Sequence, residues 1–171
     1  MSISASLLPE FDQEAAGTRK TLERLPEDKL DWRPHEKSMT MAGLATHIAN
    51  MLNWGVITIA QNEFDVQPQG SEPYREEPVK SRAELLEKFD ASLASFRAAL
   101  AGASDEAMME NWSLLAGGNV LFTMPRVACI RGMIMNHIIH HRAQLCVYYR
   151  MNDIPVPALY GPSADENAMG M

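Results

Sequence analysis

The sequence predicts an all-α protein, a four-helix bundle with long connecting loops and a non-helical C-terminal tail. Four segments of about twenty residues repeat apolar side chains at steps of three and four, the pattern of a helix with one buried face. No convincing strand pattern accompanies them, so the four apolar faces are expected to pack against one another. The 171 residues are expected to form a single domain, 1–171.

A proline and capping hydroxyls set the expected ends of the first two helices. Pro26 should stop the first helix, because the residue before a proline disfavours the helical conformation. The apolar stripe of this helix comprises Leu8, Phe11, Ala15, Thr18, Leu22 and Leu25. The second helix should begin after the stretch DWRPHEKS, with Ser38 or Thr40 as its N-cap. Its stripe comprises Met41, Leu44, Ile48, Met51 and Gly55.

The third and fourth helices also carry start signals. Ser81 and Glu84 match a capping box, and Gly102 should end the third helix. The stripe of the third helix comprises Leu86, Phe89, Leu93, Phe96 and Leu100. The fourth helix should start near residues 123–125, because proline is tolerated in a first helical turn. Its stripe comprises Val127, Ile130, Ile134, His137, His141, Leu145 and Tyr148.

Long segments connect the later helices. Residues 61–80 are polar and rich in proline, and such loops in a compact domain usually carry function or enclose a site. The stretch WSLLAGGNVLF, between the third and fourth helices, could form a small hairpin that turns at Gly117 and Gly118. The tail after Asn152 contains three prolines and should pack back on the helices without being helical.

Composition excludes several classes of function. A formal charge of −7, without a basic cluster, argues against nucleic-acid binding. The longest apolar run contains polar residues and cannot span a membrane, and the first residues do not resemble a signal peptide, so a cytoplasmic protein is expected. Cys129 and Cys146 would lie roughly 25 Å apart on one helix, too far for a disulfide, and are interpreted as reduced thiols.

The stretch NHIIHHRAQL places three of the five histidines in about one helical turn. His137 and His141 are four residues apart on the apolar stripe, so both imidazoles can reach one metal ion. His47, beside the stripe of the second helix, is the best candidate for a third ligand, whereas His35 should be solvated. His140 competes through its three-residue spacing from His137 and is interpreted as a flanking residue. Hydrogen-bonded core imidazoles are the alternative for each histidine.

A set of three histidines leaves coordination positions open, as in catalytic metal sites. Zinc, nickel and iron(II) all suit imidazole ligands. Asn50, Asn136 and Gln144 are candidates to accept a hydrogen bond from the outer nitrogens of such ligands, although each could be an ordinary surface residue. Arg142 could bind an anionic group or form a salt bridge, and Trp54 could line a pocket or the core.

Several stretches together resemble the DinB/YfiT-like family of metal-dependent bundle proteins over nearly the whole chain. They are DWRPHEKS, LATHIANMLNW, NHIIHHRAQLCVYYR and VPALYGPSADE, in that order. The resemblance implies a four-helix bundle with a divalent metal bound by His47, His137 and His141, which leaves His140 as a non-ligand. Relatives include transferases that use small thiols and a thiol-dependent isomerase, and family members commonly form homodimers. Ala143 stands where the family often has glycine, a departure expected to affect packing.

The acid–base chemistry of the sequence separates two kinds of reaction. A metal-dependent hydrolase usually adds a carboxylate as general base, but Asp12 and Asp90 fall beside their stripes, and nothing directs the loop residues Glu63 or Asp65 inward. A metal-bound thiol needs no separate base, because the cation deprotonates it. The sequence therefore favours a divalent metal (zinc, nickel or iron) and a low-molecular-weight thiol as cofactors.

The predicted function is that of a metal-dependent enzyme that transfers a small thiol to an electrophilic small-molecule substrate. The alternatives are a metal-dependent hydrolase, a non-catalytic protein that binds a metal or a small ligand, and a purely structural bundle with buried histidines. A homodimer, with no nucleic-acid or membrane partner, is expected.

Overall fold

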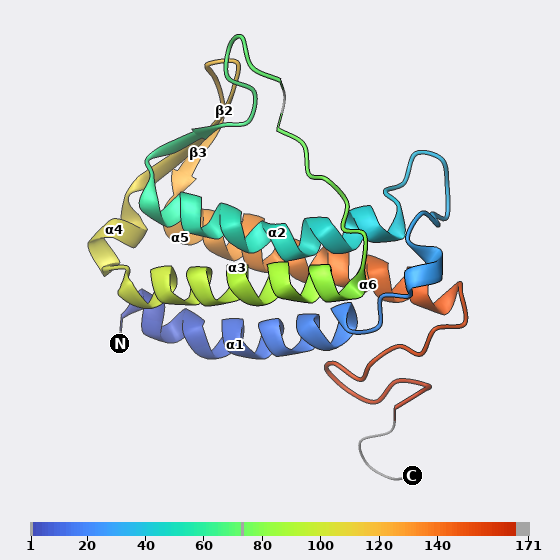
Figure 1. The fold of residues 1–171 in the computed structure, drawn as a ribbon. Coiled ribbons are helices and arrows are strands. Elements are labelled where there is room, and N and C mark those ends of the chain that lie inside the picture. The colour runs from blue at the N-terminus through green and yellow to red at the C-terminus, as the bar shows by residue number, and fades with distance from the viewer. Residues whose placement is uncertain (1, 73, 167–171) are drawn as a thin grey trace.

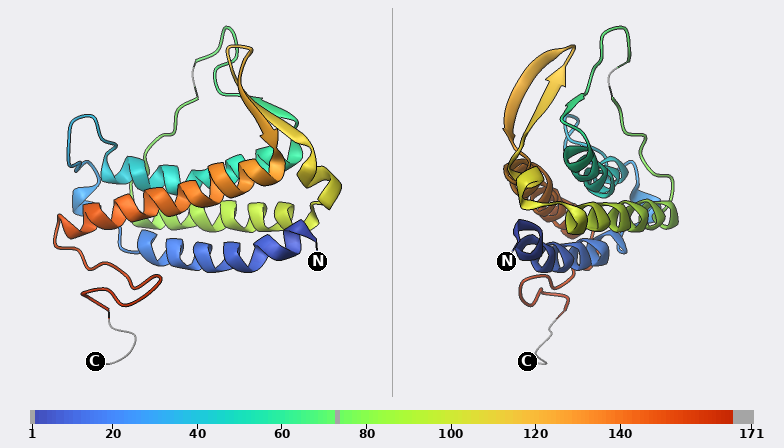
Figure 2. Two further views of the ribbon diagram at one scale, coloured as in Figure 1. Left: turned by 180° about the vertical axis from the view of Figure 1, so that it is seen from behind. Right: turned by 90° about the vertical axis from the view of Figure 1, so that its left-hand side faces the viewer.

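The structure is a computed structural model that describes residues 2–72 and 74–166, and it is mostly helical. The long helices are α1 (Ile3–Leu22), α2 (Met41–Ala60), α3 (Arg82–Gly102) and α6 (Asn136–Arg150). Each of α1 and α2 packs against both α3 and α6, so the long helices run side by side around a shared core (Figure 1, Figure 2). The segments predicted to be helical are helical, except that residues 123–125 lie in a strand and the last helical segment begins at Arg126. None of the described helices is long and apolar enough to cross a membrane.

The helix ends follow the signals in the sequence. Thr40 is the N-cap of α2, and its Oγ1 accepts a hydrogen bond from the Gly43 N–H at 3.0 Å. Ser81 caps α3 by accepting from the Glu84 N–H at 3.1 Å. The Glu84 carboxylate accepts from the Lys80 N–H instead of the Ser81 N–H, so the capping box is displaced by one residue. A short 3₁₀ turn, η1 (Glu27–Lys29), follows Pro26.

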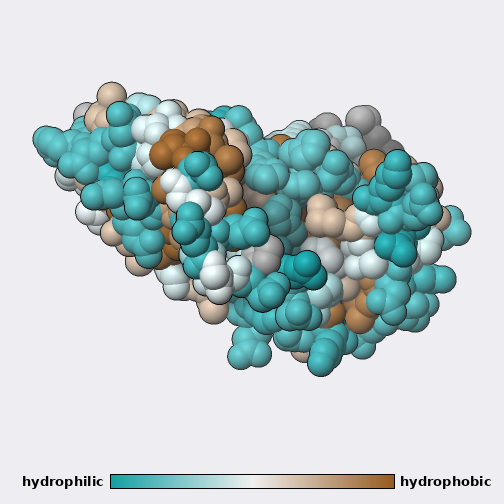
Figure 3. Space-filling view, turned by 90° about the horizontal axis from the view of Figure 1, so that it is seen from above, coloured by the Kyte–Doolittle hydropathy of each residue, from teal (hydrophilic) through white to brown (hydrophobic). Residues whose placement is uncertain are grey.

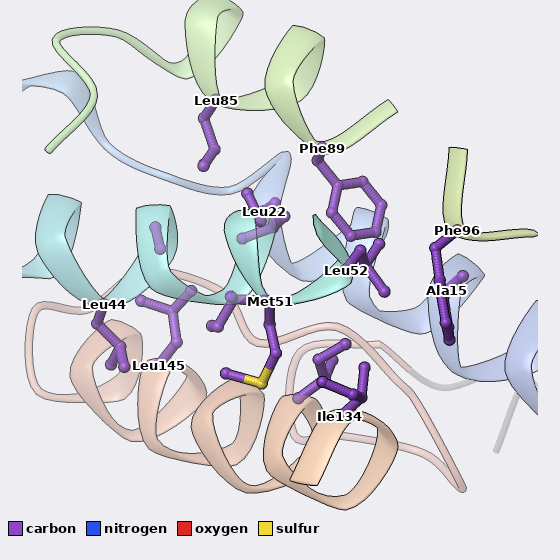
Figure 4. Packing of buried hydrophobic residues seen from close by; sticks show 14 of the residues in the cluster. Ala15, Leu22, Leu44, Met51, Leu52, Leu85, Phe89, Phe96, Ile134 and Leu145 are labelled. Atoms are coloured by element: carbon purple, nitrogen blue, oxygen red, sulfur yellow. The ribbon is translucent and has the colours of Figure 1, made fainter. Parts of the chain in front are cut away.

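The core contains most residues of the predicted stripes together with others outside them, such as Leu52 and Leu85 (Figure 4). The stripe residues Leu86 and Leu93 are only half-buried. Met51 points from α2 towards the last helical segment, where Ile134 lies, and Leu22, Leu52 and Phe89 fill the space between the other helices. The approach of α2 to α3 depends on Gly55. A Cβ atom at this position would lie 2.5 Å from the ring of Phe96, which is fully buried. The fold therefore needs a residue without a side chain there.

The last helix differs from the single regular helix that was predicted. It consists of α5 (Arg126–Cys129), a π-helical segment η2 (Ile130–Met135) and then α6. The π segment ends at the residue before Asn136, and the Asn136 N–H donates to the Arg131 carbonyl, five residues earlier. Such segments change the rotational register of the residues that follow. In α6, Tyr149 is fully buried, whereas the predicted stripe residue Tyr148 is only half-buried.

The all-α prediction was wrong in one respect, because the chain contains a small sheet. Its strands are β1 (Glu63–Asp65), β2 (Asn111–Ala116) and β3 (Asn119–Pro125), in the order β1-β2-β3. Strands β2 and β3 form the suggested hairpin, and Gly117 and Gly118 at its turn have φ of 60° and 79°. Strand β1, within the segment predicted to be a loop, pairs with β2 in parallel. Hydrophobic side chains gather on the surface over this sheet (Figure 3).

The tail after α6 is non-helical and packs back on the helices, as expected. Asp165 pairs with Arg150, and Glu166 pairs with Arg24. The short helix α4 (Asp105–Met109) links α3 to the hairpin.

Candidate metal centre

The structure brings together the three histidines that the sequence singled out. His47 lies in the second turn of α2, and His137 and His141 lie in the first turns of α6. One ligand nitrogen from each lies within 4.8 Å of the other two. The Nε2 atoms of His137 and His141 are 2.8 Å apart, and the ring of His47 faces both of theirs edge-on. Two helices far apart in the sequence thus bring three imidazoles to one point.

The Nδ1 atom of each ring has its own partner. His47 Nδ1 lies 3.0 Å from Glu76 Oε2, and His141 Nδ1 lies 2.7 Å from Gln144 Oε1. His137 Nδ1 lies 3.3 Å from the Met133 carbonyl oxygen. These oxygens are acceptors, so each Nδ1 carries the proton and donates it. The Nε2 atoms are therefore the unprotonated ones, with their lone pairs free.

This arrangement fits a divalent cation. Two lone pairs facing each other at 2.8 Å repel unless a positive charge lies between them. Nitrogens that bind one ion at about 2.0–2.1 Å lie roughly 3 Å from each other, close to the separation of these two atoms. Burial, the largest cause, and the neighbouring imidazoles lower the pKa of His141 to about 4 and lower that of His137. Both rings are thus neutral at pH 7, as metal binding requires.

Glu76 is the residue of this site that the sequence did not reveal. It lies in the loop after β1, and its side chain is 16% exposed. Its second oxygen accepts a hydrogen bond from Asn50 Nδ2 at 2.9 Å. Burial favours the neutral form of the carboxyl group, but the hydrogen bonds from His47 and Asn50 outweigh it and lower its pKa. A negative charge therefore lies beside the Nδ1 atom of His47.

Three of the four acidic residues considered from the sequence have other roles. Asp65 accepts hydrogen bonds from the backbone of Gln67, Gly117 and Gly118 and stabilises the turns beside the sheet. Asp12 and Asp90 form ion pairs on the surface with arginines of other helices. The sequence carried no signal for Glu76, because its position depends on a loop that is held by contacts with distant residues.

Two of the three amides proposed as partners do support the cluster. Gln144 holds His141, and Asn50 holds Glu76, whereas Asn136 contacts Arg131 instead. His140 is exposed and contributes no nitrogen to the group described above, although its ring centroid lies 5.0 Å from that of His141. His35 is exposed, as expected.

Arg142 forms the salt bridge that was one of its two interpretations. Its side chain is 2% exposed and lies 2.6 Å from the carboxylate of Glu14, which is itself buried. Its guanidinium also donates to the Glu14 carbonyl, to Thr18 and to the hydroxyl of Tyr160 in the tail. Arg142 therefore joins α1, α6 and the tail. Cys129 and Cys146 are unpaired, and burial raises the pKa of both thiols.

Two hollows meet at His47. A cleft of about 640 Å³, open to solvent, lies between the start of α2 and the loop that carries Glu76. A smaller cavity of about 90 Å³ lies beneath the β2–β3 hairpin and reaches His47 and His137. Trp54 lines both hollows, so it is a pocket residue as well as part of the packing. The histidine cluster can thus be reached from two sides.

A mostly helical protein with a partly buried cluster of three histidines belongs to a class in which helices present imidazoles to a metal. The model of the DinB superfamily matches residues 10–145, a range that includes all three histidines. The chain belongs to this superfamily, whose members in general bind metals.

Three relatives have a similar sequence or structure. YrdA of Bacillus subtilis (strain 168) is 26% identical over 161 residues, which cover 93% of this chain and 89% of YrdA. The crystal structure of the DinB-like protein YjoA from Bacillus subtilis has a TM-score of 0.66 at 20% identity. The match covers 89% of this chain and 96% of the YjoA chain. The crystal structure of a DinB-like protein from Bacillus cereus has a TM-score of 0.65 at 20% identity. The match covers 90% of this chain and 95% of the Bacillus cereus chain. These two structures support the fold alone.

Proposed function

We propose that the protein is a divalent-metal enzyme, built on a bundle of its long helices, that activates a small thiol for transfer to an electrophile. His47, His137 and His141 are the proposed ligands. The observation that carries the proposal is that one nitrogen of each of the three histidines converges on one point, while the Nδ1 atom of each ring has a hydrogen-bond partner outside the cluster. Three protein ligands leave room for an exogenous group, as in catalytic metal sites.

The chemistry that the metal supplies when bound is the lowering of the pKa of a coordinated thiol, so that a thiolate forms without a separate base. The protein side chains orient the site. Glu76 fixes the tautomer of His47 and increases its basicity, and Gln144 does the same for His141. Trp54 limits access of water where the two hollows meet.

The two hollows support a reaction with two substrates. The open cleft is large enough for a polar thiol of many atoms, and the small cavity beneath the hairpin suits an apolar electrophile. Each substrate would approach the histidines from its own side.

Hydrolysis is supported less well, although Glu76 is a carboxylate close to the site. Both of its oxygens are engaged, one by His47 and the other by Asn50, and its contact with His47 is made to the outer nitrogen. A general base must instead reach the proton that it removes. The geometry therefore favours an orienting role for Glu76.

Metal content tests the proposal first. Protein purified without a His tag or added metal is analysed by mass spectrometry beside His47→Ala and His137→Ala/His141→Ala, with His140→Ala as the matched control. We expect about one metal ion per chain in the wild type and in His140→Ala, and less than a tenth of that in the other variants. A wild type that takes up neither zinc, nickel nor iron(II) on titration would overturn the proposal.

Loss of free thiol then measures turnover with a panel of low-molecular-weight thiols and alkylating agents. Consumption of electrophile that requires both metal and thiol supports S-transfer. A metal-bound protein that turns over no thiol, ester or amide would instead be a non-catalytic binding protein.

A further inference from the structure

The small cavity beside the histidines is lined mostly by apolar side chains. It lies between α2, η2 and the face of the hairpin that carries Trp112, Leu114 and Phe122. Leu114 and Phe122 are opposite each other in the β2–β3 pair, and Trp112 is two residues from Leu114, so all three side chains share a face. Trp112 also carries a polar group, its indole N–H.

Trp112 Nε1 is a buried donor without an acceptor among the residues that the structure describes. The side chain is 2% exposed, so this atom is shielded from solvent. The hydroxyl of Thr58, which also lines the cavity, donates to the Trp54 carbonyl at 2.9 Å. An indole N–H can only donate, and buried polar groups in native proteins are nearly always paired. An unpaired donor on a side chain that lines a mostly apolar cavity therefore points to a ligand that brings its own acceptor.

The size of the cavity limits that ligand. Its volume of about 90 Å³ is smaller than the cavity of about 150 Å³ that binds benzene in an engineered protein. It thus accommodates about four or five non-hydrogen atoms. No charged side chain lines it, so a charged group would lose its hydration without compensation. A short, uncharged aliphatic group with one oxygen acceptor satisfies each of these conditions.

We propose that this cavity binds a small aliphatic carbonyl compound, whose oxygen accepts a hydrogen bond from Trp112 Nε1. His47 and His137 also line the cavity, so the bound molecule lies next to the histidine cluster. This assignment rests on the proposed function in one respect only, that the carbonyl compound is the electrophile. Binding itself requires neither metal nor thiol.

The probe is 2-butanone, compared with 2-methyl-1-butene, which has the same shape but lacks the carbonyl oxygen. The three tryptophans give three indole signals in a ¹H–¹⁵N NMR spectrum, and Trp112→Phe identifies the relevant one. We expect 2-butanone to shift the Trp112 indole signal downfield with saturation and to bind about tenfold more tightly than the alkene. The titrations are run on metal-free and zinc-treated protein.

Variants separate the hydrogen bond from the shape of the cavity. In Trp112→Phe, methionine methyl signals should report equal binding of the two probes. Thr58→Val is the matched control, because its hydroxyl is already used within α2, and it should keep the preference for the ketone. Leu114→Phe fills the cavity without altering Trp112, and should abolish binding of both probes even if Trp112→Phe fails to fold.

Equal affinity for the two probes in the wild type, or a ketone preference that survives in Trp112→Phe, would overturn this assignment. Either result would leave the metal and thiol measurements above unaffected. Conversely, selective ketone binding without thiol turnover would support the cavity assignment and contradict S-transfer.

Discussion

Glu76 Oε2 lies 3.0 Å from His47 Nδ1, a contact that ties the long loop after β1 to the N-terminal half of α2. Asn50, one turn further along α2, holds the other carboxylate oxygen. A carboxylate behind a ligand histidine fixes the orientation of the ring and raises its basicity. The loop therefore contributes to the histidine cluster without supplying a nitrogen to it.

Replacing Glu76 with Gln should lower the affinity for a divalent metal by about 10- to 100-fold. The amide keeps an acceptor for His47 but removes the negative charge. Competition with a chromophoric chelator measures the affinity. Glu77→Gln is the matched control, since Glu77 is exposed and lies beside Glu76 in the sequence. An unchanged metal affinity in Glu76→Gln would show that Glu76 does not tune His47.

Replacing Arg142 with Met should destabilise the fold by about 3–5 kcal/mol, because the buried carboxylate of Glu14 would lose its partner. Denaturant unfolding followed by circular dichroism measures the change. Arg131→Met is the control, because Arg131 and its partner Glu10 are each 41% exposed, and pairs of this kind contribute at most about 1 kcal/mol. A similar decrease in the free energy of unfolding in Arg142→Met and Arg131→Met would contradict the role assigned to the buried pair.

Gly55→Ala should cost about 1–3 kcal/mol, since the added methyl group would overlap the buried ring of Phe96. Gly102→Ala tests the opposite case, because a Cβ at that helix end has no neighbour within 4 Å. We expect Gly102→Ala to leave the unfolding midpoint nearly unchanged. If the two variants unfold alike, the close approach of α2 to α3 does not require glycine.

Acid should release the tail from the helices. The hydrogen bond from Arg150, the largest cause, lowers the pKa of Asp165 below its ordinary value of 3.8. The hydrogen bond from the Ala158 N–H, with help from Arg24, lowers the pKa of Glu166 below 4.5. A lowered pKa stabilises the docked tail above the ordinary values, and this stabilisation is lost as the pH falls through the lowered ones.

Amide signals of the tail, followed by NMR from pH 6 to pH 3, should therefore show its release below about pH 4. In Arg150→Ala the release should occur at a higher pH, because the pKa of Asp165 would return towards its ordinary value. If the pH at which half of the tail is released is the same in Arg150→Ala and in the wild type, the Arg150–Asp165 pair does not hold the tail.

Local interactions explain what the sequence by itself determined. Helix periodicity and caps such as Thr40 depend on residues within a few positions of each other, so the helical segments could be predicted. The spacing of His137 and His141, which placed them on one face, is equally local. The turn at Gly117 and Gly118 requires positive φ angles that glycine adopts readily, and the hairpin was foreseen for that reason.

Only the tertiary structure decided which distant groups meet. Strand β1 has three residues and becomes a strand by pairing with β2, about fifty positions later, so no pattern within it could reveal the sheet. Glu76 reaches His47 across 29 positions through an irregular loop. The unpaired donor of Trp112 likewise follows from the hairpin covering α2 and η2. Such contacts depend on how the elements pack, because the free energy that selects them is gained only when distant surfaces come together.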